Sequence, residues 1–171
     1  MTYRIRQRVL VAAASLAVVS SIVLLDAQRR EPGKPPLRQA IEASLKVGGL
    51  SYDSREPGRC THAPTAAIYS VISEMWSVQQ SSDGRSLTLT LWRPKDGSGD
   101  MVTLSVNNGS ASHEINTVRG GGATRGAGKV AFEKSGAGGV FTITGKTGDG
   151  AAVSGTISCN AFAPHVAEGG L

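Results

Sequence analysis

The last third of the chain, residues 128–159, reads as three short strands joined by two glycine-rich turns. The strand segments are GKVAFEK, VFTITGK and AAVSGTISC, and the turns are SGAGG and TGDG. Alternation of polar and apolar residues with a period of two is typical of strands that bury one face. The last strand ends on Cys159, one of two cysteines in the chain, and the other is Cys60. If the two sulfurs pair, the last strand is fastened to an early one, and everything between them forms a closed β-domain.

Composition points to the same fold class. The 171 residues include 22 glycines, and aromatic residues make up only 5% of the chain, so Val, Leu, Ile and Ala must supply most of the core. Many glycines with few helical patterns are typical of a turn-rich all-β domain. About seven to eight strands, at intervals of roughly 10–15 residues, predict an antiparallel sandwich or an open barrel. We also expect an N-terminal membrane or signal helix and one short helix.

The N-terminus has the features of a segment that directs export. Val9–Leu25 is a run of 17 residues without charge, Gly or Pro, and Arg4, Arg6 and Arg8 precede it. As a helix this run would rise about 25 Å, just short of the ~30 Å hydrocarbon core of a bilayer. Residues 1–27 are therefore expected to be either a signal anchor or a secretory signal peptide. In both cases the positive-inside rule places the three arginines in the cytoplasm and exports the rest of the chain.

The end of the apolar run bears on two kinds of processing. Leu25 and the charged Asp26 precede Ala27, which is unlike an A-x-A cleavage site and favours an uncleaved anchor. A bacterial lipoprotein has a cysteine at this point to carry its lipid, and this sequence has none there. We therefore expect any membrane attachment to be made by the helix itself.

Beyond this segment the chain divides into a linker, a short helix, a β-domain and a tail. The linker QRREPGKPP is charged and rich in proline, which is typical of a semi-rigid stalk. Leu37, Ile41 and Leu45 follow an i, i+4, i+8 spacing, which predicts one narrow apolar stripe on a helix. The expected boundaries are 28–36 for the linker, 37–47 for the short helix, 48–160 for the β-domain and 161–171 for the flexible tail.

The strand predictions are clearest in the middle of the chain. Arg85–Trp92 places three leucines on one face and polar residues on the other. The stretch 66–80 is ambiguous between helix and strand. Its β-branched and aromatic residues favour a strand at Glu74–Gln80, with Trp76 and Val78 on one face.

Cys60 and Cys159 are predicted to form one disulfide, because exported chains meet an oxidising compartment. The alternative is two buried free thiols. Pairing would close a loop of roughly 100 residues, for which the chain-entropy model allows up to about 4.7 kcal/mol of stabilisation. His62 lies two residues from Cys60, but a thiol–imidazole couple needs a free thiolate. The disulfide would remove that catalytic option.

The sequence offers no pattern for a catalytic centre, a metal site or a cofactor. The three histidines, His62, His113 and His165, are scattered and lack the spacing of metal ligands. Residues 122–129 (GATRGAGK) depart twice from a phosphate-binding loop, since alanine replaces its first glycine and Val130 replaces the Ser or Thr that would hold Mg²⁺. We expect this segment to be a glycine-rich loop.

The order of features between Cys60 and Cys159 resembles the mycobacterial 19-kDa lipoprotein antigen family, the LpqH-like envelope lipoproteins. These features are a cysteine at the end of an early strand, a later Asp83-Gly84 turn, and a terminal segment from Gly126 that carries FTITGKTGDG and ends in TISC. The resemblance implies an exported, membrane-anchored, non-enzymatic β-domain with one disulfide and a surface or adhesive role. The chain departs from the family at the anchor, where the lipidation cysteine is missing.

Charge and export together define the functional expectation. From Ala27 onward, 15 basic and 12 acidic residues leave a net charge of +3, which is too evenly spread for nucleic-acid binding. We expect a bacterial cell-envelope protein that is held in the inner membrane with its C-terminal domain outside, or is periplasmic or secreted if cleaved. Its expected role is non-enzymatic binding or structural support, with an envelope protein or surface ligand as partner. The alternatives are a carrier of a small apolar ligand or lipid and an uncharacterised enzyme.

Overall fold

The structure, a computed structural model, describes residues 38–120 and 122–165 and contains eleven strands and no helix within these ranges. Three of the strands are ten or more residues long and form consecutive hairpins in the middle of the chain. The strands are β1 (Gln39–Val47), β2 (Leu50–Ser54), β3 (Pro57–Ile68), β4 (Val71–Ser82), β5 (Arg85–Pro94), β6 (Met101–Asn108), β7 (Ser112–Asn116), β8 (Ala127–Ser135), β9 (Gly138–Lys146), β10 (Ala152–Cys159) and β11 (Ala163–Pro164).

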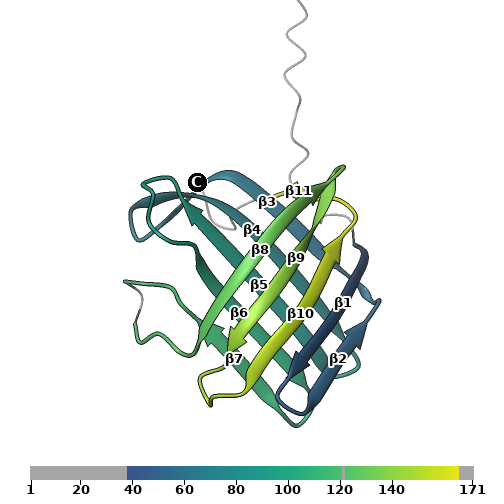
Figure 1. Ribbon diagram of the computed structural model, residues 1–171. Helices are drawn as coiled ribbons and strands as arrows, with labels where there is room; N and C mark the ends of the chain where they lie inside the picture. The colour runs from purple at the N-terminus through teal and green to yellow at the C-terminus, as the bar shows by residue number, and fades with distance from the viewer. Residues whose placement is uncertain (1–37, 121, 166–171) are drawn as a thin grey trace, which may run out of the picture. The chain divides into compact units, whose positions relative to one another are not determined.

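All strands belong to one sheet. Its order is β7-β6-β5-β4-β3-β1-β10-β9-β8, with β2 paired to β1 and β11 paired to β3. Every pairing is antiparallel except that of β11 with β3. Figure 1 shows two layers whose strands cross, with β3 to β7 behind and β8, β9, β10, β1 and β2 in front. β1 joins the layers, because its first two residues pair with β3 and the rest pair with β10.

The two ends of the sheet, β7 and β8, approach each other at a seam. Asn116 and Arg125 exchange two backbone hydrogen bonds there, with N–O distances of 2.7 and 2.8 Å. The Gly148 amide, in the turn between β9 and β10, donates to the carbonyl oxygen of Glu114 on β7 at 3.0 Å. Part of the hydrogen-bonding capacity of an otherwise open sheet edge is thereby satisfied within the domain.

Alternating side chains from both layers fill the space between them. On β1, for example, the buried residues are every second one from Ile41 to Val47, and those between are exposed. Burial of a side chain of this size contributes about 1.5–3 kcal/mol, so this cluster supplies most of the driving force for folding. The largest fully buried side chains are Tyr52, Phe141, Ile41, Leu45, Leu87, Leu89, Leu91, Leu104, Ile115, Ile143, Ile157 and Val47.

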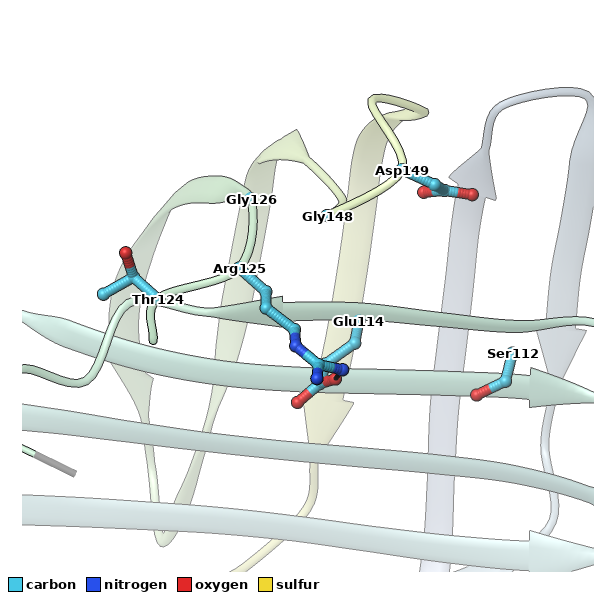
Figure 2. A pocket seen from close by; sticks show the side chains of 7 residues that line it. All are labelled: Ser112, Glu114, Thr124, Arg125, Gly126, Gly148 and Asp149. Atoms are coloured by element: carbon cyan, nitrogen blue, oxygen red, sulfur yellow. Dashed lines mark hydrogen bonds and ion pairs between the residues drawn. The ribbon is translucent and has the colours of Figure 1, made fainter. Parts of the chain in front are cut away.

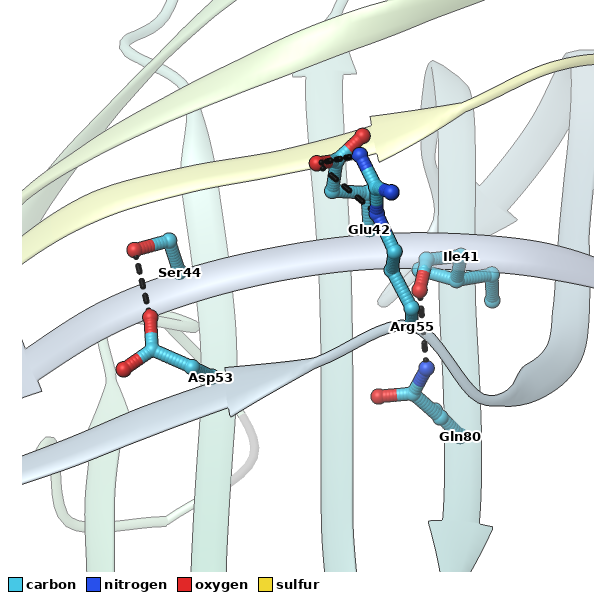
Figure 3. Close-up of polar contacts among 6 residues, drawn as sticks. All are labelled: Ile41, Glu42, Ser44, Asp53, Arg55 and Gln80. Atoms are coloured by element: carbon cyan, nitrogen blue, oxygen red, sulfur yellow. Dashed lines mark hydrogen bonds and ion pairs between the residues drawn. The ribbon is translucent and has the colours of Figure 1, made fainter.

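Polar contacts hold the corner where β1 and β2 meet β4 (Figure 3). The amide nitrogen of Gln80, a residue only 3% exposed, donates to the carbonyl oxygens of Ile41 at 3.0 Å and Glu56 at 2.8 Å. Its amide oxygen accepts from the Tyr52 hydroxyl at 3.3 Å. The buried amide is therefore fully used, as buried polar groups must be. Two further side-chain contacts lie on the exposed side of this corner: Arg55 with Glu42, and Ser44 with Asp53 (Figure 3).

The predicted short helix at 37–47 is wrong, because residues 39–47 form β1. Ile41 and Leu45 satisfy a helical i, i+4 spacing, but a spacing of four is also twice the strand period of two. Ala43 and Val47 lie on the same buried face and complete the alternation. Pairing with β10 on one side and β2 on the other then fixes the extended conformation, whatever the local helical propensity.

The predicted all-β antiparallel class is confirmed, but the structure has eleven strands where the sequence predicts about seven to eight. The predicted strand at 74–80 is part of the longer β4, on which Trp76 and Val78 are both buried. The predicted tail at 161–171 contains β11, which pairs with β3. Local patterns miss β11 because its pairing partner is distant in the chain.

The predicted signal or anchor segment, 1–27, and the predicted linker, 28–36, lie outside the described residues. The topology signal Arg4, Arg6 and Arg8 belongs to the same part of the chain. In the portion that the structure describes, no helix has the length and apolar character needed to cross a membrane.

Candidate functional site

The predicted disulfide between Cys60 and Cys159 is present. Their Cα atoms are 6.2 Å apart, and their sequence separation is 99 residues. Cys60 lies on β3 and Cys159 ends β10, so the bond joins the two layers. Since Cys60 is oxidised, His62 has no thiolate beside it, and the two residues do not form a nucleophilic couple.

The most exposed large apolar side chains of the described residues lie at one turn. We call residues 68–72, which connect β3 to β4, the hairpin tip. Tyr69 and Ile72 are each 56% exposed. Tyr69 (φ 46°) and Ser70 (φ 68°) form a two-residue turn in the left-handed region of the backbone. Such strain in non-glycine residues costs of order 1–3 kcal/mol and clusters at functional sites, which makes the tip a candidate binding element.

A cavity of about 270 Å³ lies against the hairpin tip. The Tyr69 ring covers Gly120, where an added Cβ would lie 3.2 Å from Cγ of the ring. The Arg119 guanidinium reaches Gly99, since an added Cβ there would lie 3.6 Å from Nη2. Three connections, β3–β4, β5–β6 and β7–β8, thus meet at this cavity. Its lining residues are Ile68, Tyr69, Val71, Ser98, Gly99, Met101, Arg119 and Gly120.

An aromatic and ionic cluster supports the base of this hairpin. Nε2 of His62 lies 2.8 Å from Oε1 of Glu74, and the His62 ring stacks on Trp76 with centroids 5.1 Å apart. The Arg93 guanidinium lies 5.3 Å from the Trp76 ring centroid and pairs with Asp100 at 3.2 Å. Arg93 and Asp100 are thus oppositely charged partners, and the Glu74 carboxylate contacts the His62 imidazole. The cluster therefore connects β3, β4 and β5 below the tip.

A larger, polar groove of about 580 Å³ lies at the seam between β7 and β8. Figure 2 shows Arg125 and Glu114 directed toward each other, and their Nη1 and Oε2 atoms are 3.3 Å apart. At the other end of the groove, Oδ2 of Asp149 is 3.5 Å from Nδ1 of His113. The lining residues are Ser112, Glu114, Thr124, Arg125, Gly126, Gly148 and Asp149.

The groove supplies fixed hydrogen-bonding groups. The Thr147 hydroxyl donates to Asp149 and holds the pKa of that carboxyl below its usual range. Asp149 is therefore ionised at neutral pH and acts as an acceptor, and it is not a proton donor. Side chains that are already paired and ionised suit reversible contact with a polar molecule better than general acid–base chemistry.

The three histidines make separate contacts in different parts of the domain. His62 pairs with Glu74, His113 faces Asp149, and Nδ1 of His165 is 3.3 Å from the Thr61 hydroxyl. Across the described ranges, 38–120 and 122–165, no group of three or more His, Cys, Asp or Glu side chains is arranged to hold a metal ion. The histidines thus serve separate local contacts.

Sequence reasoning does not find the hairpin tip. A two-residue turn with two positive φ angles usually contains Asn, Asp or Gly, and Tyr69-Ser70 contains none of them. The one available signal is the surrounding run AAIYSVI, which has no charge and no regular polar alternation. That run predicts a segment without a solvated face, but it does not place a turn inside it.

Comparison with protein-family models, with curated proteins and with solved structures gives no match. The functional assignment therefore rests on the residues themselves.

Proposed function

We propose that this chain is an exported bacterial envelope protein whose β-domain binds an envelope component through the hairpin tip and catalyses no reaction. The N-terminal segment either anchors it in the inner membrane or is cleaved, and the domain lies on the outer side. This role matches what the resemblance to the 19-kDa lipoprotein antigen family implies, with a helix in place of the lipid anchor.

The observation that carries the proposal is the exposure of Tyr69 and Ile72, each 56% exposed, in a domain whose other described large apolar residues are buried or half-buried. Full burial of a side chain of this size contributes about 1.5–3 kcal/mol. Since Tyr69 and Ile72 are each 56% exposed, roughly half of that free energy per side chain is left for an intermolecular contact. Exposed apolar groups gathered in one place mark interaction sites. The positive φ angles of Tyr69 and Ser70 support the same interpretation, since they hold the turn in a conformation that these residue types disfavour.

Binding is favoured over catalysis by the state of the reactive groups. Cys60 and Cys159 are joined to each other, Glu74 contacts the His62 imidazole, and Arg93 and Asp100 form an ion pair. A general base needs a free proton-accepting position within reach of a substrate. Paired groups of this kind support a structural role.

Surface contact is also favoured over transport of a ligand in the interior. The inward-facing side chains of both layers form one buried cluster, and the two cavities described above lie at the surface. A carrier needs an apolar cavity large enough for its cargo, and pockets for small ligands measure about 300–1,000 Å³. The buried cluster therefore supports a binding module over a carrier.

Photochemical cross-linking in living bacteria tests the proposal. The full chain carries a benzophenone amino acid at position 69 or at position 72, and irradiation is expected to give an adduct with an envelope component. The control carries the same group at Asp83, an exposed residue of the β4–β5 turn. The proposal fails if positions 69 and 72 give no adduct, or if Asp83 gives the same adduct.

A further inference from the structure

We propose that the hairpin tip docks on an anionic lipid surface by inserting Tyr69 and Ile72 between the headgroups. This inference rests on the proposed function and specifies the partner as the bilayer. Three observations carry it: the faces on which the two side chains lie, the charges beside them and the cavity against the tip.

The two exposed side chains lie on opposite sides of the hairpin. Ile72 pairs with Ala67, whereas the Tyr69 ring covers Gly120 on the side of the cavity that Ile68 and Val71 also line. Successive residues of a strand point to opposite faces, so a flat protein partner could cover one face of the hairpin only. A lipid interface surrounds an inserted tip from all sides. Insertion tip-first therefore buries both Tyr69 and Ile72, which docking on one face would not.

Two basic residues flank the tip. The Lys95 amide donates to the carbonyl oxygen of Ile72 at 2.9 Å, which places Lys95 beside the tip, and Arg119 lines the cavity. Both are exposed, and neither is in an ion pair among the described residues. Asp96 is the acid next to Lys95, and its carboxylate accepts from the Ser98 amide at 2.9 Å. Apolar residues with neighbouring cations are the chemistry that anionic membranes attract.

The tip also has room to adapt. The connections around it contain Gly97, Gly99, Gly120 and Gly122. The cavity of about 270 Å³ behind Tyr69 has apolar walls from Ile68, Val71 and Met101. Aromatic rings with one polar end favour the headgroup level of a bilayer, so Tyr69 is suited to this depth.

The predicted anchor and linker, if present as the sequence indicates, agree with this inference. Nine residues, 28–36, separate the predicted membrane segment from Leu37. An extended chain spans at most about 3.5 Å per residue, so this linker reaches about 30 Å. A tethered domain meets a nearby surface at high effective concentration, and a weak contact at the tip is then sufficient.

The test uses the full chain held by its N-terminal segment in nanodiscs of phosphatidylglycerol, with phosphatidylcholine nanodiscs for comparison. Hydrogen exchange of the backbone amides at 68–72 is expected to slow by about fivefold or more in the anionic discs. Exchange at the β4–β5 turn, 82–85, should be the same in both lipids. Equal exchange at 68–72 in the two lipids would overturn the inference.

Two variants separate the apolar and the charged contributions. Tyr69→Ser/Ile72→Ser should abolish the lipid-dependent protection, and Lys95→Gln/Arg119→Gln should reduce it to the level in phosphatidylcholine. The control Lys46→Gln/Lys129→Gln removes two exposed charges outside the tip and should leave the lipid-dependent protection unchanged. If the control variant loses as much protection as the Lys95 and Arg119 variant, general electrostatic attraction explains the effect and the inference fails.

Failure of the lipid inference is distinguishable from failure of the proposed function. Adducts of positions 69 and 72 with a protein or a glycan, together with no protection in nanodiscs, would overturn lipid docking and retain envelope binding. Adducts between two copies of this chain would overturn lipid docking in favour of self-association. No adducts and no protection would overturn both proposals.

Discussion

Gly155 of β10 pairs with Leu45 of β1 and has no room for a side chain beside the β1 backbone. Its φ is 147°, and an added Cβ would lie 2.1 Å from the carbonyl oxygen of Ser44 and 2.8 Å from Cα of Leu45. Gly150 also has a positive φ, 88°, but nothing lies within 4 Å of an added Cβ. Comparing substitutions at Gly150 and Gly155 therefore distinguishes the cost of backbone strain from the cost of a steric clash.

Gly150→Ala is expected to lower the free energy of unfolding by about 1 kcal/mol, from conformational strain alone. Gly155→Ala should lower it by about 3 kcal/mol or more, because the added methyl group also forces β10 away from β1. Urea denaturation of the full chain and its variants measures both values. Equal losses at the two positions would contradict the close approach of β10 to β1.

Tyr52 provides a pH-dependent term in stability. Burial raises the pKa of its hydroxyl above the usual 10.0, and the nearby Arg85 guanidinium, 4.5 Å from the ring centroid, partly opposes this. Above a pH of about 10, the unfolded chain therefore binds fewer protons at this position than the folded chain, and the free energy of unfolding falls as the pH rises.

Tyr52→Phe removes this ionisation and should flatten the loss of stability between a pH of about 9 and about 11. Urea denaturation across that range measures the free energy of unfolding of both proteins. Lysines and the other tyrosines titrate in both, so their contribution drops out of the difference between wild type and variant. Tyr69→Phe is the matched control, since Tyr69 is exposed. A decline of unchanged slope in Tyr52→Phe would show that Tyr52 is not the group responsible.

At the scale of elements, two turns show what local sequence can and cannot predict. The β4–β5 turn is Asp83-Gly84, with φ of 49° and 75°, and the Asp-Gly pair predicts it directly. The β3–β4 turn has the same pattern of positive φ angles at Tyr69 and Ser70, where no residue type signals it. The first turn is specified by local propensity, and the second is imposed by the pairing of β3 with β4.

The substitution pair Tyr69→Asn/Ser70→Gly tests this contrast. Asn-Gly is the preferred sequence for a turn with two positive φ angles. The free energy of unfolding of the variant is therefore expected to be about 1–2 kcal/mol higher than that of wild type. Thermal and urea denaturation measure the gain. The same variant removes the Tyr69 side chain and should lose adduct formation from position 72, in line with a trade between stability and function. Unchanged stability would mean that the turn is not strained.

At the scale of the whole molecule, the sequence predicts which face of a strand is buried better than it predicts which strands pair with each other. The inward leucines of β5 follow from alternation alone, and the structure confirms them. The seam between β7 and β8 and the double pairing of β1 depend on residues far apart in the chain. Alternation carries no information about which strands pair. The hairpin tip shares this limitation, because its exposure results from the arrangement of three connections.

The disulfide is the one long-range contact that the sequence does specify, and it leads to a prediction for the whole domain. Cys60 and Cys159 are 99 residues apart, and the bond joins β3 in one layer to β10 in the other. In the chain-entropy model such a loop contributes up to about 4.7 kcal/mol by restricting the unfolded state. Cys60→Ala/Cys159→Ala should therefore lower the free energy of unfolding by about 3–5 kcal/mol.

Reduction of the wild-type chain should produce a loss similar to that of the double variant, and reductant should not change the variant itself. Thermal and urea denaturation with and without dithiothreitol measure all four states. The alanine pair avoids burying new hydroxyl groups, since both cysteines are at most 3% exposed. If wild type denatures identically with and without reductant, the bond does not stabilise the fold. The two layers would then be held together by the apolar core, the pairing of β1 with β3 and the seam between β7 and β8.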